Sequence, residues 1–343
     1  MIGGMAPADF AVISDHAIMF ASIVYAIAVV AHLVEWASSL AGAPVAVPRA
    51  TEPVTVPAGA SVAERSGQDA DLDADAASGD AAEERRELRI ETAGRAGVAL
   101  TVLAAALHLV AVVTRGLASD PVRVPWGNMY EFTMTGSLGV AVIYLALLRP
   151  LRLRWMGLFV TGFLVTVLML ANLTLQEEAG PLVPALHSYW LVIHVGAAML
   201  ATGAFSVGAL AALVFLLKER VQDRPGPRSQ ALLARFPATD ALDRLSYRLH
   251  AVGFPLWTFA ALIAGPIWAE YAWGSYWNWD PKEVWAFITW VIYAAYLHAR
   301  ATAGWKGRAA ALLALVGFAS LLFNFVGINF FFGAGSMHSY AGS

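Results

Sequence analysis

The chain has 343 residues, of which 59% are hydrophobic and only 14% are charged. This apolar balance exceeds that of an ordinary soluble domain and predicts several membrane spans. The net charge of −3 gives no sign of nucleic-acid binding. The absence of cysteine from the sequence excludes disulfides, thiol nucleophiles and cysteine–metal sites.

Long apolar runs follow one another along the chain. The first, 13–33, is expected to span the membrane and not to be a cleavable signal, because no Lys or Arg precedes Arg49. A span needs about 20 mostly apolar residues. The runs that qualify are Ile13–Leu33, Ala96–Thr114, Met129–Leu148, Trp155–Leu175, Tyr189–Leu217, Val252–Tyr271, Val284–Ala299 and Ala309–Phe332. The sequence therefore predicts an all-α, polytopic transmembrane helical bundle with about eight spans.

Basic residues are divided unevenly between the two sets of loops. If both termini lie outside, only Arg115, Arg123 and Lys282 of the 22 Lys and Arg fall on the outer side. Since Lys and Arg are retained on the cytoplasmic side of membrane proteins, both termini are predicted to lie outside.

Composition divides the chain into three parts. Residues 1–40 hold the first predicted transmembrane helix. Residues 41–94 are predicted to be a disordered cytoplasmic linker, because this segment is rich in Ala, Pro, Asp and Glu and buries too little apolar surface to fold. Residues 95–343 form the predicted transmembrane domain, which includes a shorter polar loop with an expected amphipathic helix at 229–236.

A Trp-rich loop, 271–285, joins the sixth and seventh predicted spans on the outer side. Its Trp residues are Trp273, Trp277, Trp279 and Trp285. One interpretation is an aromatic belt at the membrane surface. The other is a flat platform for a flat ligand such as haem, whose ring needs aromatic walls and whose propionates need polar or cationic partners. Spacing alone does not choose between these interpretations.

The polar residues of the loop predict its backbone. Asp280 is the expected N-cap of the following helix, with Pro281 at its first position and Glu283 in its first turn. Gly274 allows close backbone approach. Lys282 is the cation nearest to the aromatic residues and is therefore the candidate partner for a ligand carboxylate.

Two histidines flank this loop at the same predicted depth. His194 lies near the outer end of the fifth span, and His338 lies just beyond the eighth. Haem iron takes axial imidazole ligands, so this pair is a candidate ligand set. His298, in the inner half of the seventh span, is a third candidate. For each, the alternative is a packing residue bonded to a backbone carbonyl. The other histidines carry no comparable argument: His16, His32, His108, His187 and His250.

Glu131 lies at the outer end of the third predicted span. One interpretation is a carboxylate that hydrogen-bonds a site histidine and fixes its tautomer. The other is a charge in the first turn of a helix, which suits the helix dipole.

These motifs together resemble the tryptophan-rich "WWD" haem-handling proteins, and most closely the CcsA/ResC family of System II cytochrome c biogenesis, called CcsB in some bacteria. The resemblance extends from about residue 126 to the C-terminus. It is carried by the Trp-rich loop and by the segments Pro125–Phe132, Tyr189–Val195, Gly253–Pro255, Tyr296–Arg300, Phe323–Asn329 and Met337–Tyr340.

The resemblance implies delivery of haem and its attachment to apocytochrome c, as a subunit of a holocytochrome c synthase or haem lyase complex, with haem export as a further role. It implies non-covalent haem b held by His194 and His338. It also implies a haem site within the membrane at His298, with the opposite ligand from a ResB-type membrane partner or from His32 or His250.

Further partners implied by the resemblance are an apocytochrome c with a Cys-x-x-Cys-His motif and thiol-reducing proteins. The implied location is the bacterial inner membrane, with the active face outside. The alternatives are a b-type haem electron-transfer subunit, a proton-coupled transporter and a non-catalytic scaffold. The first needs histidine pairs half a membrane apart on one helix, a pattern that no predicted span shows.

Overall fold

The computed structural model describes residues 6–40, 62–178, 188–222, 233–234, 236–332 and 336–338. Within these ranges the chain forms helices joined by turns, without a strand. Seven helical segments are long and apolar enough to cross a membrane. The prediction of an all-α, multi-pass membrane protein is therefore confirmed.

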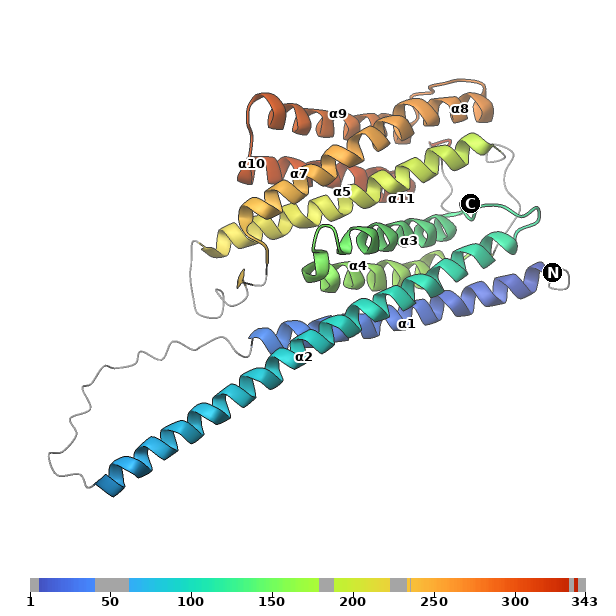
Figure 1. Cartoon of the computed structure of the whole chain (residues 1–343). Coiled ribbons are helices and arrows are strands. Elements are labelled where there is room, and N and C mark those ends of the chain that lie inside the picture. The colour runs from blue at the N-terminus through green and yellow to red at the C-terminus, as the bar shows by residue number, and fades with distance from the viewer. Residues whose placement is uncertain are drawn as a thin grey trace.

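Helices run back and forth between two ends of an elongated bundle (Figure 1). The segments are α1 (Pro7–Leu40), α2 (Val62–Leu117), α3 (Met129–Leu148), η1 (Leu153–Met156), α4 (Gly157–Leu170), η2 (Ala171–Leu175), α5 (Tyr189–Gln222), α7 (Thr239–Thr258), η4 (Phe259–Ala264), α8 (Gly265–Trp273), α9 (Pro281–Thr302), α10 (Gly307–Leu322), η5 (Phe323–Gly327) and α11 (Ile328–Phe331). Helices α1 and α2 lie side by side along one flank, with α3 and α4 next to them. Segments α5 to α11 form the rest of the bundle.

Helix α9 is the predicted seventh span, and it falls outside the seven segments that meet the apolarity criterion. It nevertheless runs antiparallel to its neighbours and packs against α7 and α10. The start of α1 and the end of α11 lie at the same end of the bundle (Figure 1), an arrangement that requires an even number of crossings. Counting α9 satisfies this requirement, in agreement with about eight spans.

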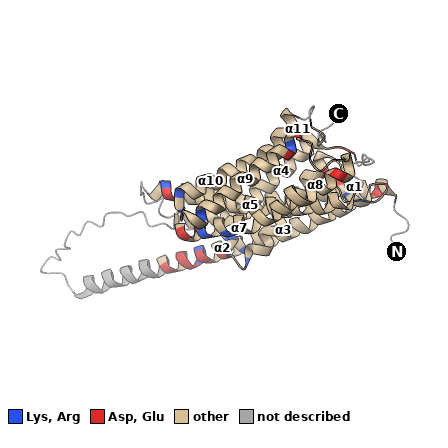
Figure 2. Cartoon of the chain, turned by 90° about the horizontal axis from the view of Figure 1, so that it is seen from above, with Lys and Arg blue, Asp and Glu red and all other residues tan. Residues whose placement is uncertain are grey.

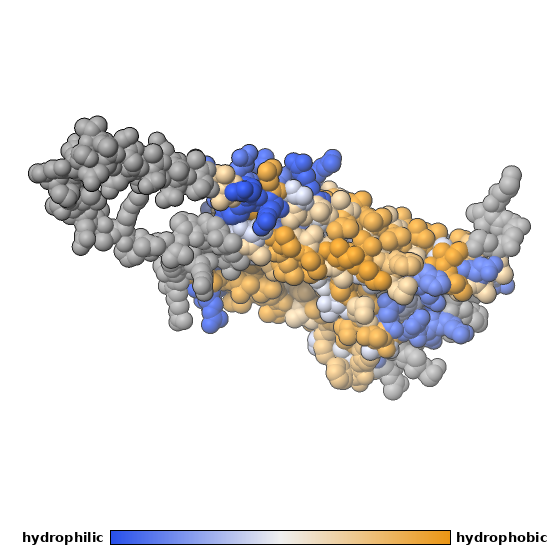
Figure 3. Space-filling view, turned by 90° about the horizontal axis from the view of Figure 1, so that it is seen from below, coloured by the Kyte–Doolittle hydropathy of each residue, from blue (hydrophilic) through white to orange (hydrophobic). Residues whose placement is uncertain are grey.

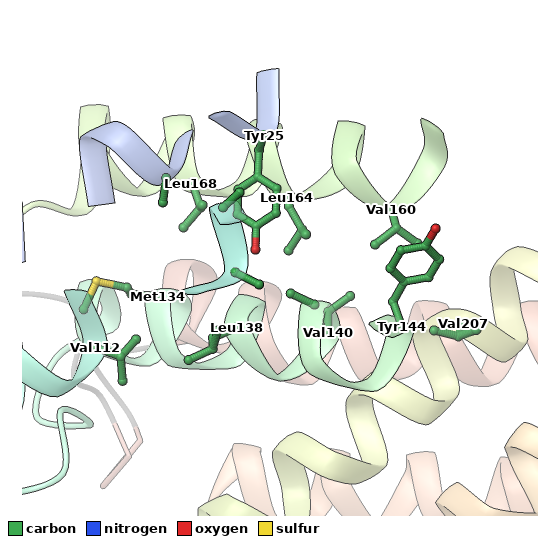
Figure 4. Packing of buried hydrophobic residues seen from close by; sticks show 14 of the residues in the cluster. Tyr25, Val112, Met134, Leu138, Val140, Tyr144, Val160, Leu164, Leu168 and Val207 are labelled. Carbon is green, nitrogen blue, oxygen red and sulfur yellow. The ribbon is translucent and has the colours of Figure 1, made fainter. Parts of the chain in front are cut away.

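Close packing of small and aromatic residues holds the first four helices together. Tyr25, Met134 and Tyr144 are almost completely buried between α1, α3 and α4 (Figure 4). Alanines such as Ala21 and Ala104 are fully buried where α1 meets α2, so the two backbones approach closely. Large apolar side chains face outward and form an apolar surface between the polar ends of the bundle (Figure 3).

Helix α2 begins much earlier than the sequence predicts. Residues 41–61 of the expected linker 41–94 lie outside the described residues, but the helix starts at Val62. In the structure, residues 62–94 of that segment are helical. Its Ala, Glu and Arg residues are strong helix formers, and pairs such as Glu91 with Arg95 at i,i+4 (2.6 Å) support the exposed helix.

Charges distinguish the two ends of the bundle (Figure 2). Described Lys and Arg residues gather at the end where α4 and α10 begin, hereafter the basic end. The opposite end carries Arg115, Arg123 and Lys282. This division follows the predicted distribution of basic residues.

Lys218, near the end of α5, holds the segment that precedes α7. Its Nζ donates hydrogen bonds to the backbone oxygens of Leu233 (3.1 Å), Phe236 (3.1 Å) and Pro237 (2.9 Å). The ring of Phe236 in turn packs edge-on against Trp36 of α1, 5.1 Å between centroids. The buried ammonium thus connects the two halves of the bundle. Most of the amphipathic helix expected at 229–236 lies outside the described residues.

We expect Lys218→Met to lower the free energy of unfolding by about 1–3 kcal/mol, because three partly buried carbonyl oxygens lose a charged donor. Thermal unfolding of the detergent-purified protein measures the change. Lys306→Met is the matched control, since Lys306 is exposed at the same end of the bundle. Equal stability of the two variants would show that the contacts of Lys218 contribute nothing.

Candidate functional site

A cavity opens at the end of the bundle opposite the basic end. Its empty space measures about 1080 Å³, including its open side. It is lined by residues of the loop before α3 and of α3, α5, α7, η4, α8, the Trp-rich loop, the start of α9, η5 and α11, together with His338. Four tryptophans contribute to its walls: Trp126, Trp257, Trp268 and Trp277. The predicted candidates His194, His338, Trp277 and Lys282 all line this one cavity.

A π-helical turn positions His194. In η4 the carbonyl oxygen of Ala260 accepts from Gly265 five residues later, and it also accepts a hydrogen bond from Nδ1 of His194 on α5, at 2.9 Å. Because a carbonyl only accepts, Nδ1 carries the proton and Nε2 is left with its lone pair. The imidazole stacks on Trp268, with 5.9 Å between ring centroids and 11° between planes. Departures from regular helix of this kind are common at functional sites.

The lack of a side chain at Gly265 leaves space for the ring of His194 beside the carbonyl oxygen of Ala260. A Cβ at this position would lie 3.0 Å from the oxygen of Ala260 and 3.1 Å from the ring of His194. We expect Gly265→Val to displace the imidazole and to lower the free energy of unfolding by about 1–3 kcal/mol, the usual cost of overpacking. Thermal unfolding tests this against Gly162→Ala, whose added Cβ meets nothing within 4 Å. A Gly265→Val protein as stable as the control would contradict the expectation.

Asp280 holds His338 in place. Its Oδ1 accepts from Nδ1 of His338 (3.0 Å) and from the hydroxyl of Ser336 (2.9 Å), and its Oδ2 accepts from the amide of Met337 (2.6 Å). The same carboxylate is the N-cap of α9, as predicted, through the amide of Lys282 (2.9 Å). One buried side chain therefore joins the 336–338 segment to the Trp-rich loop.

The Asp280–His338 pair has a defined protonation state at neutral pH. Burial alone would raise the pKa of Asp280, but the hydrogen bonds from His338 and from backbone amides outweigh it and lower the pKa to about 2. Burial lowers the pKa of His338, despite the opposing effect of Asp280. Asp280 is thus ionised and His338 is neutral, with its proton on Nδ1. The stabilisation from Asp280 is complete above its ordinary pKa of 3.8 and is lost as the pH falls toward 2.

Two aromatic rings support both histidines. His338 packs edge-on against Trp273 (4.6 Å) and Trp268 (5.4 Å). Trp268 therefore contacts both imidazoles. Neither Trp268 nor the lining residue Trp126 is among the predicted site residues. Trp268 falls in the predicted span Val252–Tyr271, and Trp126 falls in the family motif Pro125–Phe132. The spacing of five residues between Trp268 and Trp273 does not indicate that both rings contact His338.

Three other predicted residues of the Trp-rich loop, Gly274, Trp279 and Trp285, lie outside the cavity lining. Gly274 ends α8 with φ +73°, a left-handed conformation that favours glycine. Trp279 is 77% exposed and meets Trp277 edge-on at 6.0 Å. Trp285 donates from Nε1 to the backbone oxygen of Ser320 (2.9 Å) and so holds α9 against α10. Neither Trp279 nor Trp285 lines the cavity.

Glu131 is fully buried, and its described partners include no histidine. It accepts from Arg115 (3.3 Å), from Arg123 (2.6 Å) and from the amide of Gly127 (2.8 Å). The expectation that it orients a site histidine finds no support in these contacts. Glu131 instead fixes the loop before α3, and this loop brings Trp126 to the cavity wall.

His298 lies far from the cavity, exposed on α9 near the basic end. Two residues on, Arg300 pairs with Asp243 of α7 through two hydrogen bonds of 2.7 and 3.0 Å. The structure therefore does not bring His298 to His194 and His338.

The remaining described histidines of the membrane interior are buried and bonded to nearby groups. His32 contacts Glu35 (3.3 Å), His108 the backbone oxygen of Met134 (2.8 Å), and His250 the backbone oxygen of Ser246 (2.7 Å). His187 lies outside the described residues.

Fold and site together define a multi-pass helical membrane protein whose one end holds a cavity walled by tryptophan and two histidines. Residues 126–334 match the family model described as "Cytochrome C assembly protein". The chain belongs to this family, and cytochrome c biogenesis is therefore the process in which it takes part. The matched range includes His194, Lys282 and His298 and ends shortly before His338.

Individual proteins that are similar to this chain also belong to cytochrome c biogenesis. The cytochrome c biogenesis protein CcsA of Synechococcus sp. (strain JA-3-3Ab) is 37% identical, over 63% of this chain and 77% of its own. CcsA of Guillardia theta is 38% identical, over 71% of this chain and 85% of its own. The solved structure of the cytochrome c heme lyase CcmF shares the fold, with a TM-score of 0.53 at 16% identity. The match covers 95% of this chain and about half, 48%, of that structure.

Proposed function

We propose that the cavity holds haem b non-covalently, with Nε2 of His194 and Nε2 of His338 as axial ligands, and presents it for attachment to apocytochrome c. One observation carries the proposal. Both histidines line the same aromatic cavity, and each has its Nδ1 engaged by a protein oxygen. That arrangement orients an imidazole and leaves Nε2 for a metal.

Each part of the site has a role in this function. The tryptophans supply apolar faces for the macrocycle. The carbonyl of Ala260 and the carboxylate of Asp280 fix the tautomers of the two ligands, and the charge on Asp280 makes His338 the more basic donor. The chain's contribution is position and environment, while the reactive groups belong to haem and to its acceptor.

In the attachment step, each of the two thiols of the Cys-x-x-Cys-His segment adds across one vinyl group of haem. A carbon–sulfur bond forms, and the thiol proton passes to the other vinyl carbon, so no external oxidant or reductant is consumed. Thiol-reducing proteins keep the acceptor cysteines in the reactive form. The histidine of the acceptor segment then replaces one of the two ligands from this chain.

We place the cavity on the outer face of the bacterial inner membrane. The supporting observation is the concentration of Lys and Arg at the opposite end of the bundle, the side that such residues mark as cytoplasmic. Apocytochrome c and the thiol-reducing proteins would therefore meet this chain outside.

The visible spectrum of the detergent-purified protein titrated with haem tests the proposal. A low-spin spectrum with two histidine ligands is expected in the wild type. A spectrum that is the same in wild type and in the His194→Ala/His338→Ala double variant would mean that the cavity is not the ligated site.

We further propose that His298 belongs to a second haem site, completed by a histidine of a ResB-type membrane partner. Its exposure on α9 makes it available to a neighbouring chain. We expect His298→Ala to reduce the haem that copurifies with the complex but to leave haem binding by the isolated chain unchanged. Pyridine haemochrome assays on both preparations measure this. Equal haem content in the wild-type and variant complexes would contradict the second site.

A further inference from the structure

Lys282 is a cation in the cavity wall that makes no direct ion pair with a described residue. Its Nζ donates one hydrogen bond, to Oδ1 of Asn329 at 3.1 Å, and within the described chain it forms no ion pair. The neighbouring carboxylates are engaged elsewhere. Asp280 accepts from the 336–338 segment. Oε2 of Glu283 accepts from the backbone amides of Asn278 (2.8 Å) and Asp280 (3.2 Å). An ammonium has three N–H donors, so Lys282 has donors to spare.

Two buried asparagines stand beside this cation in the lining. Asn329 is 5% exposed, and its Nδ2 donates to the backbone oxygen of Phe325 at 2.5 Å, which turns Oδ1 toward Lys282. Asn324 is also 5% exposed and lines the cavity. Its buried Oδ1 has no hydrogen-bond partner, and its NH2 donates to no described residue. Asn324 belongs to the π-helical turn η5 and Asn329 to the start of α11. Both lie in the family motif Phe323–Asn329, for which the sequence predicts no function.

A buried amide without a hydrogen-bond partner and a buried ammonium without a direct ion pair both cost free energy in a largely apolar cavity. A ligand carboxylate removes the cost at the ammonium and gives the unused amide NH2 of Asn324 an acceptor. It accepts from the ammonium of Lys282 and from the amide NH2 of Asn324, while Asn329 keeps the ammonium in position. Charge-assisted hydrogen bonds of this kind are the strong ones.

We propose that Lys282, Asn324 and Asn329 form a carboxylate subsite, which takes a propionate of a porphyrin ring and so fixes the rotation of the ring within the cavity. The identity of the ligand rests on the proposed function. The subsite itself makes a separate claim, namely that the cavity selects flat rings that carry free carboxylates.

Metal-free protoporphyrin and its dimethyl ester are the probes, because neither contains iron and neither depends on the two histidines. Their binding to the purified full chain is followed by porphyrin fluorescence. We expect the wild type to bind the free acid at least about tenfold more tightly than the diester, the scale of a lost hydrogen bond to a charged group. In Asn324→Leu and in Lys282→Met the ratio of the two affinities is expected to fall toward one. Lys282→Arg, which keeps the positive charge, should retain most of the preference for the free acid.

Asn172→Leu is the matched control, since Asn172 lies outside the cavity and bonds to Tyr130 (3.1 Å). Binding of the diester itself shows that a variant is folded, because that ligand does not need the subsite. A wild type without preference for the free acid, or cavity variants with the preference of Asn172→Leu, would overturn the proposal. The proposed function fails by a different result, a haem spectrum that does not depend on His194 and His338.

Discussion

Replacing either His194 or His338 by alanine is expected to weaken haem binding by more than about 100-fold and to abolish the maturation of c-type cytochromes. Removing groups that merely orient a metal ligand costs about 10–100-fold, and loss of the ligand itself should cost more. The measurements are the low-spin haem spectrum of the purified protein and the haem-stained c-type cytochromes of cells that depend on this chain.

Added imidazole separates loss of a ligand from loss of the fold. It should enter the space left by the side chain and restore the low-spin spectrum in each single variant. His16→Ala is the control, because His16 is exposed on α1 and has no role in the cavity. Normal maturation in both single variants would rule out the pair as the ligands.

Asp280→Ala is expected to lower haem affinity by about 10–100-fold, although Asp280 is not proposed to contact iron. The variant removes the acceptor for Nδ1 of His338 and for the amide of Met337, so the imidazole loses its orientation. It also removes the N-cap of α9, at a cost of about 1 kcal/mol in stability. Asp280→Asn retains one acceptor oxygen and should fall between wild type and Asp280→Ala. Titration with haem measures all three.

Two comparisons separate the effect on His338 from general destabilisation. Asp240→Ala removes an exposed carboxylate from the first turn of α7 and should leave affinity unchanged. In a double-mutant cycle, Asp280→Ala should add little to the loss already caused by His338→Ala, because both act on the same ligand. Fully additive losses would mean that Asp280 acts on haem binding by another route.

Much of the architecture could be predicted because lipid imposes it. Apolar runs of membrane-spanning length predicted the helices, and the Trp-rich loop with its flanking motifs predicted the family, both of which are confirmed. Equal depth in the membrane suggested His194 and His338 as a pair, and the two do line one cavity. The roles of these residues stay predictions.

Contacts between distant segments could not be predicted. Asp280 was read correctly as an N-cap, which is a local property, but its bond to His338 joins residues 58 positions apart. For Glu131 the sequence left two interpretations open, a carboxylate that orients a site histidine and a charge in the first turn of a helix; only the fold shows its contacts with Arg115 and Arg123. Low apolar content suggested disorder for residues 62–94, whereas the structure forms a helix there, in keeping with the helix propensity of Ala, Glu and Arg.

The bond between Asp280 and the 336–338 segment has a consequence for biosynthesis. His338 follows α11, the last helix of the described chain, so it reaches Asp280 only after the other described helices have been synthesised. On the ligand assignment proposed above, a nascent chain that ends before His338 offers iron only His194. We therefore expect tight haem binding only after α11 and the 336–338 segment have been made.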